Sequence, residues 1–216
     1  MTGVQTCALP ILEINNLPEH VLTDTDNYPP SYEKVQEAAK NVVNDLEGLE
    51  NVLWDREKGI SALTDQFHFT QDAADKLVYA RILGMLGEPA GWKELMEAID
   101  EYEEWDEGWN FRGMGQFGRS ISYLDSLIIA AGRTKREEVL PSIIRLAEML
   151  TPESHFSHFR AVAIAFETIA SAEAAEPLFK VLQMPGVRGH SMPNIKTAKE
   201  LTPPDKNDVS TRNNSL

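Results

Sequence analysis

The chain has 216 residues, of which 42% are hydrophobic and 25% are charged; these ordinary globular values exclude a wholly disordered protein. Its 34 acidic and 20 basic residues give a formal net charge of -14, which makes nucleic acid and anionic membrane surfaces poor partners. No apolar run approaches the roughly 18 residues that a membrane-spanning helix needs. The single cysteine, Cys7, excludes an internal disulfide and metal sites built on cysteines.

The first eleven residues differ in origin from the rest. Thr2 to Ile11 match one reading frame of a common sequencing-library adapter, so we interpret residues 1–11 as a non-native start. We therefore expect the true N-terminus to lie upstream, and neither Cys7 nor the lack of a signal peptide carries information. The polar stretch from Glu13 to Pro30 predicts a connector, which sets residues 1–30 apart from the fold.

Residues 31–66 are predicted to form the first helices. Ser31 is a candidate N-cap, and apolar residues at steps of three or four predict one helix from Ser31 to Leu53. Gly48 weakens this helix, because glycine costs about 1 kcal/mol relative to alanine. A second helix is expected from Asp55 to Thr64.

Residues 67–185 contain three similar units, each with two apolar-striped segments around a turn. The apolar positions of the first segments are Ala74, Leu77, Val78, Ile82 and Met85; Leu124, Leu127, Ile128 and Ala131; and Phe159, Val162, Phe166 and Ile169. Those of the return segments are Trp92, Leu95, Met96, Ile99 and Tyr102; Val139, Leu140, Ile143, Ala147 and Leu150; and Ala175, Leu178, Val181 and Leu182. The turns near Gly87, Gly132 and Ala170 are 45 and 38 residues apart.

Paired helices that recur at about 40 residues indicate a HEAT or armadillo array. The predicted fold is therefore all-α, a HEAT/armadillo-like α-solenoid of stacked helical hairpins; a non-repeating helical bundle is the alternative. Thr151-Pro152-Glu153 predicts a helix start, from a capping hydroxyl, a proline at the first position and an acid at the positive end. Residues 186–216 are rich in Pro and Gly and are expected to be a loop leading into a truncated next repeat.

One glycine pattern invites a cofactor interpretation. Gly113 to Gly118 fits G-x-G-x-x-G, which binds a dinucleotide when it joins a strand to a helix. No strand is predicted before it, and the acidic stretch from Glu101 to Glu107 would repel phosphate. We therefore interpret this segment as a loop between repeats and assign no cofactor-binding residue.

The same loop is rich in aromatic residues beside arginine, a combination typical of interface anchors. The candidate docking surface consists of Trp105, Trp109, Phe111, Arg112 and Phe117. The alternative is that these rings fill the groove between two repeats of the same chain.

Two histidines, His155 and His158, lie three residues apart and could bind a metal together with Glu153. Histidines on a helix are more often packing or solvent-facing residues, so we assign no metal ligand. Since no nucleophile is paired with a base, no catalytic residue is assigned either.

Three segments together resemble a known family: Trp105 to Asn110, Gly113 to Gly118 and Ser157 to Ala163. From about Leu49 to Ile195 the chain resembles the C-terminal HEAT-like region of bacterial FAD-dependent oxidoreductases. The resemblance implies a parent protein that binds FAD in a separate flavin domain, which would be this chain's partner. We expect no cofactor in this chain, which would serve as a scaffold or docking region. A stand-alone HEAT-repeat scaffold that binds another protein is the alternative.

Overall fold

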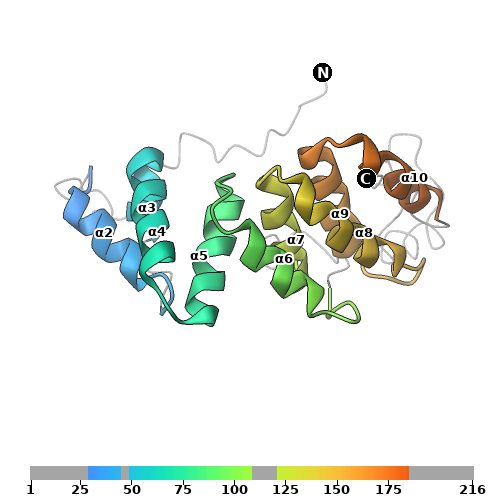
Figure 1. Ribbon diagram of the computed structural model, residues 1–216, viewed down its shortest axis with the longest axis horizontal. Coiled ribbons are helices and arrows are strands. Elements are labelled where there is room, and N and C mark those ends of the chain that lie inside the picture. The colour runs from blue at the N-terminus through green and yellow to red at the C-terminus, as the bar shows by residue number, and fades with distance from the viewer. Residues whose placement is uncertain (1–28, 45–48, 109–120, 185–216) are drawn as a thin grey trace, which may run out of the picture.

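The computed structural model describes residues 29–44, 49–108 and 121–184. Within these ranges the regular structure is helical and contains no strand, which confirms the all-α prediction. Figure 1 shows the helices following one another from α2 at one end to α10 at the other. Their bounds are α2 Tyr32–Asn41, α3 Leu49–Trp54, α4 Arg56–Phe69, α5 Ala73–Met85, α6 Trp92–Asp100, α7 Tyr123–Arg133, α8 Leu140–Glu148, α9 Phe156–Ile169 and α10 Ala175–Gln183. The adapter-like residues 1–11, the Gly113–Gly118 pattern and residues 186–216 lie outside the described ranges.

Polar side chains cap the starts of several helices. The Ser31 hydroxyl accepts from the amide of Lys34, which confirms the predicted N-cap of α2. Asp55 and Asp72 accept amides in the first turns of α4 and α5 in the same way. Such caps stabilise a helix by about 1 kcal/mol each, because the first amides of a helix have no partner within it.

The prediction of one helix from Ser31 to Leu53 is wrong. The helix α2 ends at Asn41, residues 42–44 form a turn in which Asn44 donates to the Asn41 carbonyl, and α3 begins at Leu49. The local residues explain the break, since Val42, Val43 and Asn44 are all weak helix formers. The second predicted helix exists, but α4 continues past Thr64 as far as Phe69.

The helix start predicted at Thr151-Pro152-Glu153 is also wrong. The hydroxyl of Ser154 accepts from the Thr151 amide, and the Ser154 amide donates to the Thr151 carbonyl, so these residues form a turn. The helix α9 begins at Phe156, with His155 in the N-cap position.

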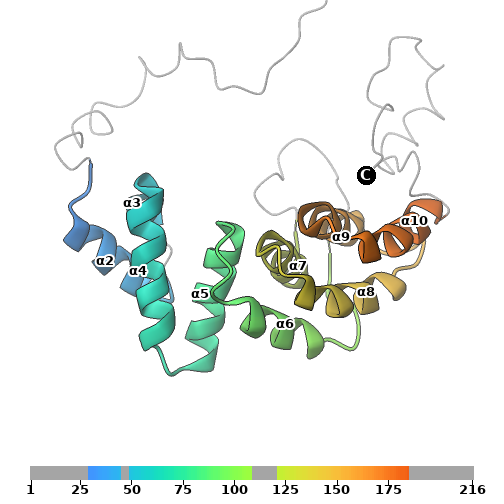
Figure 2. The same cartoon turned by 45° about the horizontal axis from the view of Figure 1, so that its top comes forward.

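The helices of the three predicted units are present, as α5 and α6, α7 and α8, and α9 and α10. The first helices of the three units pack side by side, with α7 in contact with both α5 and α9. The return helix of the middle unit, α8, contacts the other two return helices, α6 and α10. Figure 2 shows α6 and α8 lying along one side of α7 and α9. Each turn contains one residue in the left-handed region, Gly87 with φ 82°, Lys135 with φ 56° and Ala170 with φ 56°. Short 3-10 turns, Glu137–Val139 and Ala172–Ala174, precede α8 and α10.

Close approach between the first helices depends on small residues. Gly132 is the second-last residue of α7, and a Cβ atom there would lie 2.5 Å from the Cα atom of Ala165 in α9. Gly84 takes the equivalent place in α5, where a Cβ atom would lie 2.8 Å from the Ala130 carbonyl oxygen in α7. A glycine near the end of the first helix therefore allows close packing both between the first and second units and between the second and third.

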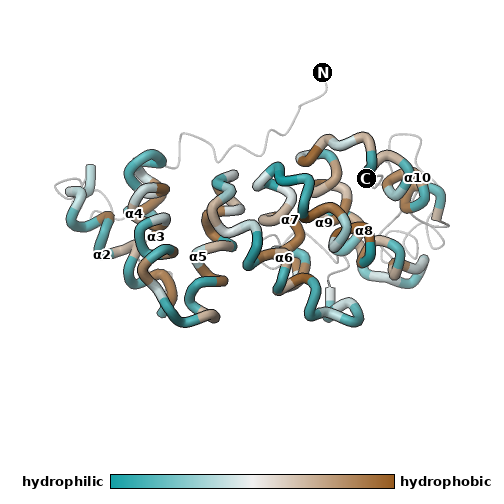
Figure 3. Tube along the Cα trace, viewed as in Figure 1, coloured by the Kyte–Doolittle hydropathy of each residue, from teal (hydrophilic) through white to brown (hydrophobic). Residues whose placement is uncertain are grey.

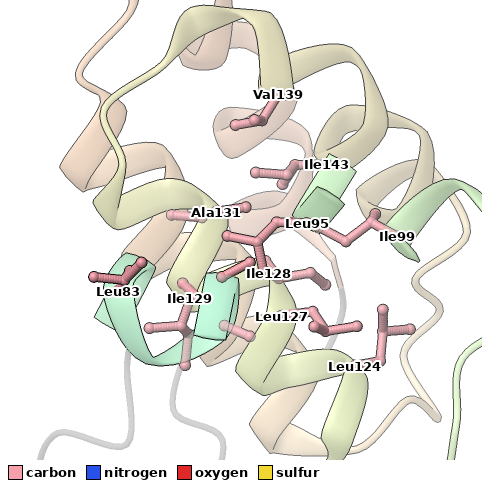
Figure 4. Packing of buried hydrophobic residues seen from close by; sticks show 14 of the residues in the cluster. Leu83, Leu95, Ile99, Leu124, Leu127, Ile128, Ile129, Ala131, Val139 and Ile143 are labelled. Atoms are coloured by element: carbon pink, nitrogen blue, oxygen red, sulfur yellow. The ribbon is translucent and has the colours of Figure 1, made fainter. Parts of the chain in front are cut away.

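The core runs through all three hairpins. Its largest fully buried side chains include Leu83, Leu95, Ile99, Leu124, Leu127, Ile128, Leu140, Ile143, Leu146, Phe159 and Phe166. Figure 4 shows how side chains from α5, α6, α7 and α8 meet in one cluster. Along most helices hydrophobic stretches alternate with hydrophilic ones (Figure 3), as expected when one face of a helix is buried. None of the described helices is long and apolar enough to cross a membrane.

Candidate functional site

Of the predicted docking residues, Trp105 lies in the described part of the chain and is partly buried. Trp109, Phe111, Arg112 and Phe117 lie outside the described residues. The indole Nε1 of Trp105 donates to the Leu146 carbonyl of α8 at 3.1 Å. Its ring also stands against the imidazole of His158, with 4.4 Å between the ring centroids. Trp105 thus makes intrachain contacts of the kind that the groove-filling alternative requires.

Beneath Trp105 lies a buried carboxylate–imidazole pair. The Nδ1 atom of His158 in α9 is 2.7 Å from Oδ1 of Asp125 in α7, and the two side chains are 1% and 0% exposed. Asp125 is held in place by a capping box, in which the Ser122 amide donates to Oδ2 at 2.8 Å and the Asp125 amide donates to the Ser122 hydroxyl at 3.0 Å. The cap of α7 and the contact with α9 therefore use the same carboxylate.

Two opposing effects act on the pKa of Asp125. Burial raises this pKa, but hydrogen bonds from His158, the Ser122 amide and Ser157 together outweigh burial and hold the pKa below its ordinary value of 3.8. Asp125 is therefore an anion near neutral pH and can only accept hydrogen bonds. It follows that Nδ1 of His158 carries the proton and donates to it.

The chain leading into residues 109–120 is fastened beside this pair. Oδ2 of Asp106 accepts from the Leu124 amide at 3.0 Å, and the Gly108 amide donates to Nδ1 of His155 at 3.3 Å. A Cβ atom on Gly108 would lie 2.5 Å from Nε2 of His158, so only glycine fits here without displacing the imidazole. We call Trp105, Asp106, Gly108, Asp125, His155 and His158 the loop-base cluster.

An arginine secures the same connection where it leaves α6. Arg145 of α8 donates to the Tyr102 carbonyl at 2.8 Å and to the Ile99 carbonyl at 3.0 Å. Its guanidinium also lies 3.6 Å from Asp100, at a partly exposed position. Since the last carbonyls of a helix have no partner within it, this arginine satisfies the end of α6 from the next unit.

Chemically, the loop-base cluster has the carboxylate–imidazole arrangement that orients a general base, with Nε2 as the working atom. Nε2 of His158 and Oδ1 of Asp106 are both buried, and neither has a hydrogen-bond partner within the described chain. Gly108 covers Nε2, however, and a general base must come within hydrogen-bond reach of the proton that it takes. Among the described residues no group of three or more His, Cys, Asp or Glu side chains could hold a metal ion. The cluster as described is suited to fastening a loop.

Sequence reasoning singled out Trp105, His155 and His158 but missed Asp125 as their partner. Asp125 and His158 are 33 residues apart, and no local pattern reports such a contact. One signal was available, because Ser122 and Asp125 have the spacing of a capping box.

Comparison with known proteins does not assign the chain to a family: no family model, no curated protein and no solved structure matches it.

Proposed function

We propose that this chain is the C-terminal helical-repeat portion of an FAD-dependent oxidoreductase-like protein, and that it serves as a scaffold and docking region for a separate flavin domain. The proposal rests on the resemblance of three segments, one of which, Ser157 to Ala163, lies in α9, and on the all-helical fold of the described residues. FAD and the redox chemistry would belong to the parent protein, and no complete active site would lie in this chain.

A HEAT-type stack is the architecture that we propose for this scaffold. Two sets of contacts support it, because stacked repeats pack each helix against the equivalent helix of the next repeat. The first helices α5, α7 and α9 pack in this order, and the return helix α8 contacts both α6 and α10. The small residues Gly84 and Gly132 occupy equivalent places, and each turn has its left-handed residue.

The length of one connection is the observation that carries the docking role. The return helices begin at Trp92, Leu140 and Ala175, which are steps of 48 and 35 residues. The longer step contains residues 109–120, and both of its flanks are fastened to the loop-base cluster, through Gly108 on one side and Ser122 on the other. Insertions into single repeats often lie on the binding face. Trp109, Phe111, Arg112 and Phe117 are the docking anchors that we propose, with Trp105 at the base.

A binding measurement tests the docking role. The chain is mixed with a separately expressed flavin domain from an intact relative, and the affinity is measured by calorimetry. We expect a complex that weakens when Trp109 is changed to Ala. The matched control is Trp54→Ala, because Trp54 is 59% exposed and lies at the end of α3, far along the chain from the loop. Equal weakening by both variants, or no complex with the folded chain, would contradict the proposal.

A spectrum tests where the cofactor belongs. The purified chain is incubated with FAD and desalted, and we expect it to remain colourless. A stoichiometric flavin spectrum would place the cofactor in this chain and return attention to Gly113–Gly118. The stand-alone scaffold is tested separately, since it requires an intact gene with a short leader and no flavin domain in frame upstream of residue 12.

A further inference from the structure

The loop-base cluster holds the chain at Gly108 with an unusual acceptor. The Gly108 amide donates to Nδ1 of His155, a ring nitrogen, at 3.3 Å. An imidazole nitrogen accepts a hydrogen bond only through its lone pair. When a proton binds to Nδ1, the lone pair is used and two N–H groups face each other. This contact therefore depends on the protonation of His155.

The neighbouring contact responds differently to acid. Nδ1 of His158 already carries a proton and donates to Asp125, whether the imidazole is neutral or charged. Proton uptake by His158 leaves this hydrogen bond in place. Protonation therefore removes the acceptor of the Gly108–His155 hydrogen bond but leaves the His158–Asp125 hydrogen bond in place.

Several titratable side chains lie around His155. The titratable side chains of the cluster around this contact are His158 in α9, Asp125 in α7 and Asp106 in the incoming loop. Glu107 and Glu153 lie close to Gly108 and His155 in the sequence. His155 and His158 have ring centroids 5.6 Å apart. His155 is also the N-cap residue of α9.

We propose that His155 is a proton-operated latch for the start of the 109–120 connection. In the neutral state its Nδ1 atom holds the Gly108 amide. When the imidazole gains a proton, Gly108 is released, while the Asp125–His158 pair and the helical stack remain intact. The latch is independent of the proposed docking role, because its action is observed within the chain itself.

Amide NMR of the full chain tests the latch directly. The Gly108 amide signal and the His155 ring signals are followed from about pH 8 to pH 5, the range in which imidazoles change charge. We expect the Gly108 proton to move upfield with the same midpoint as the His155 ring. After correction for the intrinsic pH dependence of exchange, we expect its solvent exchange to rise about tenfold, as loss of a hydrogen bond worth about 1.4 kcal/mol gives.

Three variants separate the latch from general effects of acid. In His155→Asn the amide oxygen can replace Nδ1 as an acceptor without titrating, so the Gly108 signal should stay near its high-pH position throughout. In His155→Leu it should be in the released position at every pH. The control is His68→Asn, an exposed position on α4, which should titrate like the parent chain. The proposal is overturned if Gly108 does not respond while the His155 ring titrates, if His155→Asn keeps the full transition, or if His155→Leu keeps the high-pH position.

Discussion

Nδ1 of His158 lies 2.7 Å from Oδ1 of Asp125, and this contact joins α9 to α7 between side chains that are almost wholly buried. Changing Asp125 to Asn removes the charge and weakens both the pair and the cap of α7. We expect a loss of about 1–3 kcal/mol in the free energy of unfolding, measured with urea near pH 7. The control is Asp65→Asn, at an exposed position on α4, which should change stability little. Similar losses in both variants would show that the pair contributes nothing specific.

The same variant, Asp125→Asn, also predicts how the stability difference from the parent chain changes with pH. The pKa of Asp125 is lower in the folded chain than its ordinary value of 3.8, so its contribution to stability is complete above that value. The contribution is lost as the pH falls through the depressed pKa of the folded state. Asp125→Asn lacks this contribution, so the stability difference between the two proteins should narrow in strong acid. A difference that stays constant across acid denaturation would contradict the lowered pKa.

Gly132 provides a test of how closely the first helices approach. In an open helix, changing glycine to alanine stabilises the fold by about 1 kcal/mol. Here the new Cβ atom would overlap Ala165, so we expect Gly132→Ala to destabilise by about 1–3 kcal/mol in thermal or urea unfolding. Ser61→Ala, at an exposed position in α4, is the control for helix propensity alone. A gain in stability from Gly132→Ala would mean that α7 and α9 are farther apart than described.

The continuity of the core is tested by truncating one side chain in each of two adjacent units. Leu127 and Val162 are both 0% exposed. We expect Leu127→Ala to cost about 2–5 kcal/mol and Val162→Ala to cost less, because valine loses fewer buried methyl groups. Leu53→Ala, at a side chain 46% exposed, should have a smaller effect. Each loss is measured by urea unfolding monitored by circular dichroism, and a spectrum dominated by strand would refute the architecture itself.

Arg145 links two return helices through backbone carbonyls. Changing it to Gln removes its donors to Ile99 and Tyr102. We expect a loss of about 1 kcal/mol, at the modest end because the side chain is 40% exposed and water can replace part of the contact. Arg136→Gln, at an exposed position before α8, is the charge-matched control. If both variants lose the same stability, net charge and not the end of α6 explains the effect.

The helices of the three units could be predicted because their apolar side chains recur at the helical spacing. In α7, in α9 and around α8 the structure buries the predicted positions. In α5 the predicted face was wrong, since Ala74 is exposed and the buried residues are Tyr79, Ala80, Leu83 and Gly84.

Periodicity could not locate the break after Asn41. Val42 remains in phase with Val35 and Ala38 and is buried, although it lies in a turn. Apolar phase reports which face is buried and does not report whether the backbone continues as a helix. The start of α9 was misplaced for a related reason, since Ser154 uses its hydroxyl to close a turn that resembles a cap in sequence.

The loop-base cluster was accessible to sequence reasoning only in part. Trp105 and the histidine pair are conspicuous by residue type and spacing. Their arrangement depends on α7 and α9 lying side by side, which brings Asp125 to His158 across 33 residues of chain. A contact of this kind is a property of packing between units and leaves no local pattern at either residue.

The fastened flanks of residues 109–120 make this connection a natural place for protein engineering. The Gly108 amide is held by His155 at the start of α9, and the Ser122 amide is held by Asp125 of α7. We expect the segment between them to be exchangeable for a foreign peptide, which the surrounding helices would present at a fixed position. The chain would then serve as a small display framework, with the insertion point set by the step of 48 residues between Trp92 and Leu140.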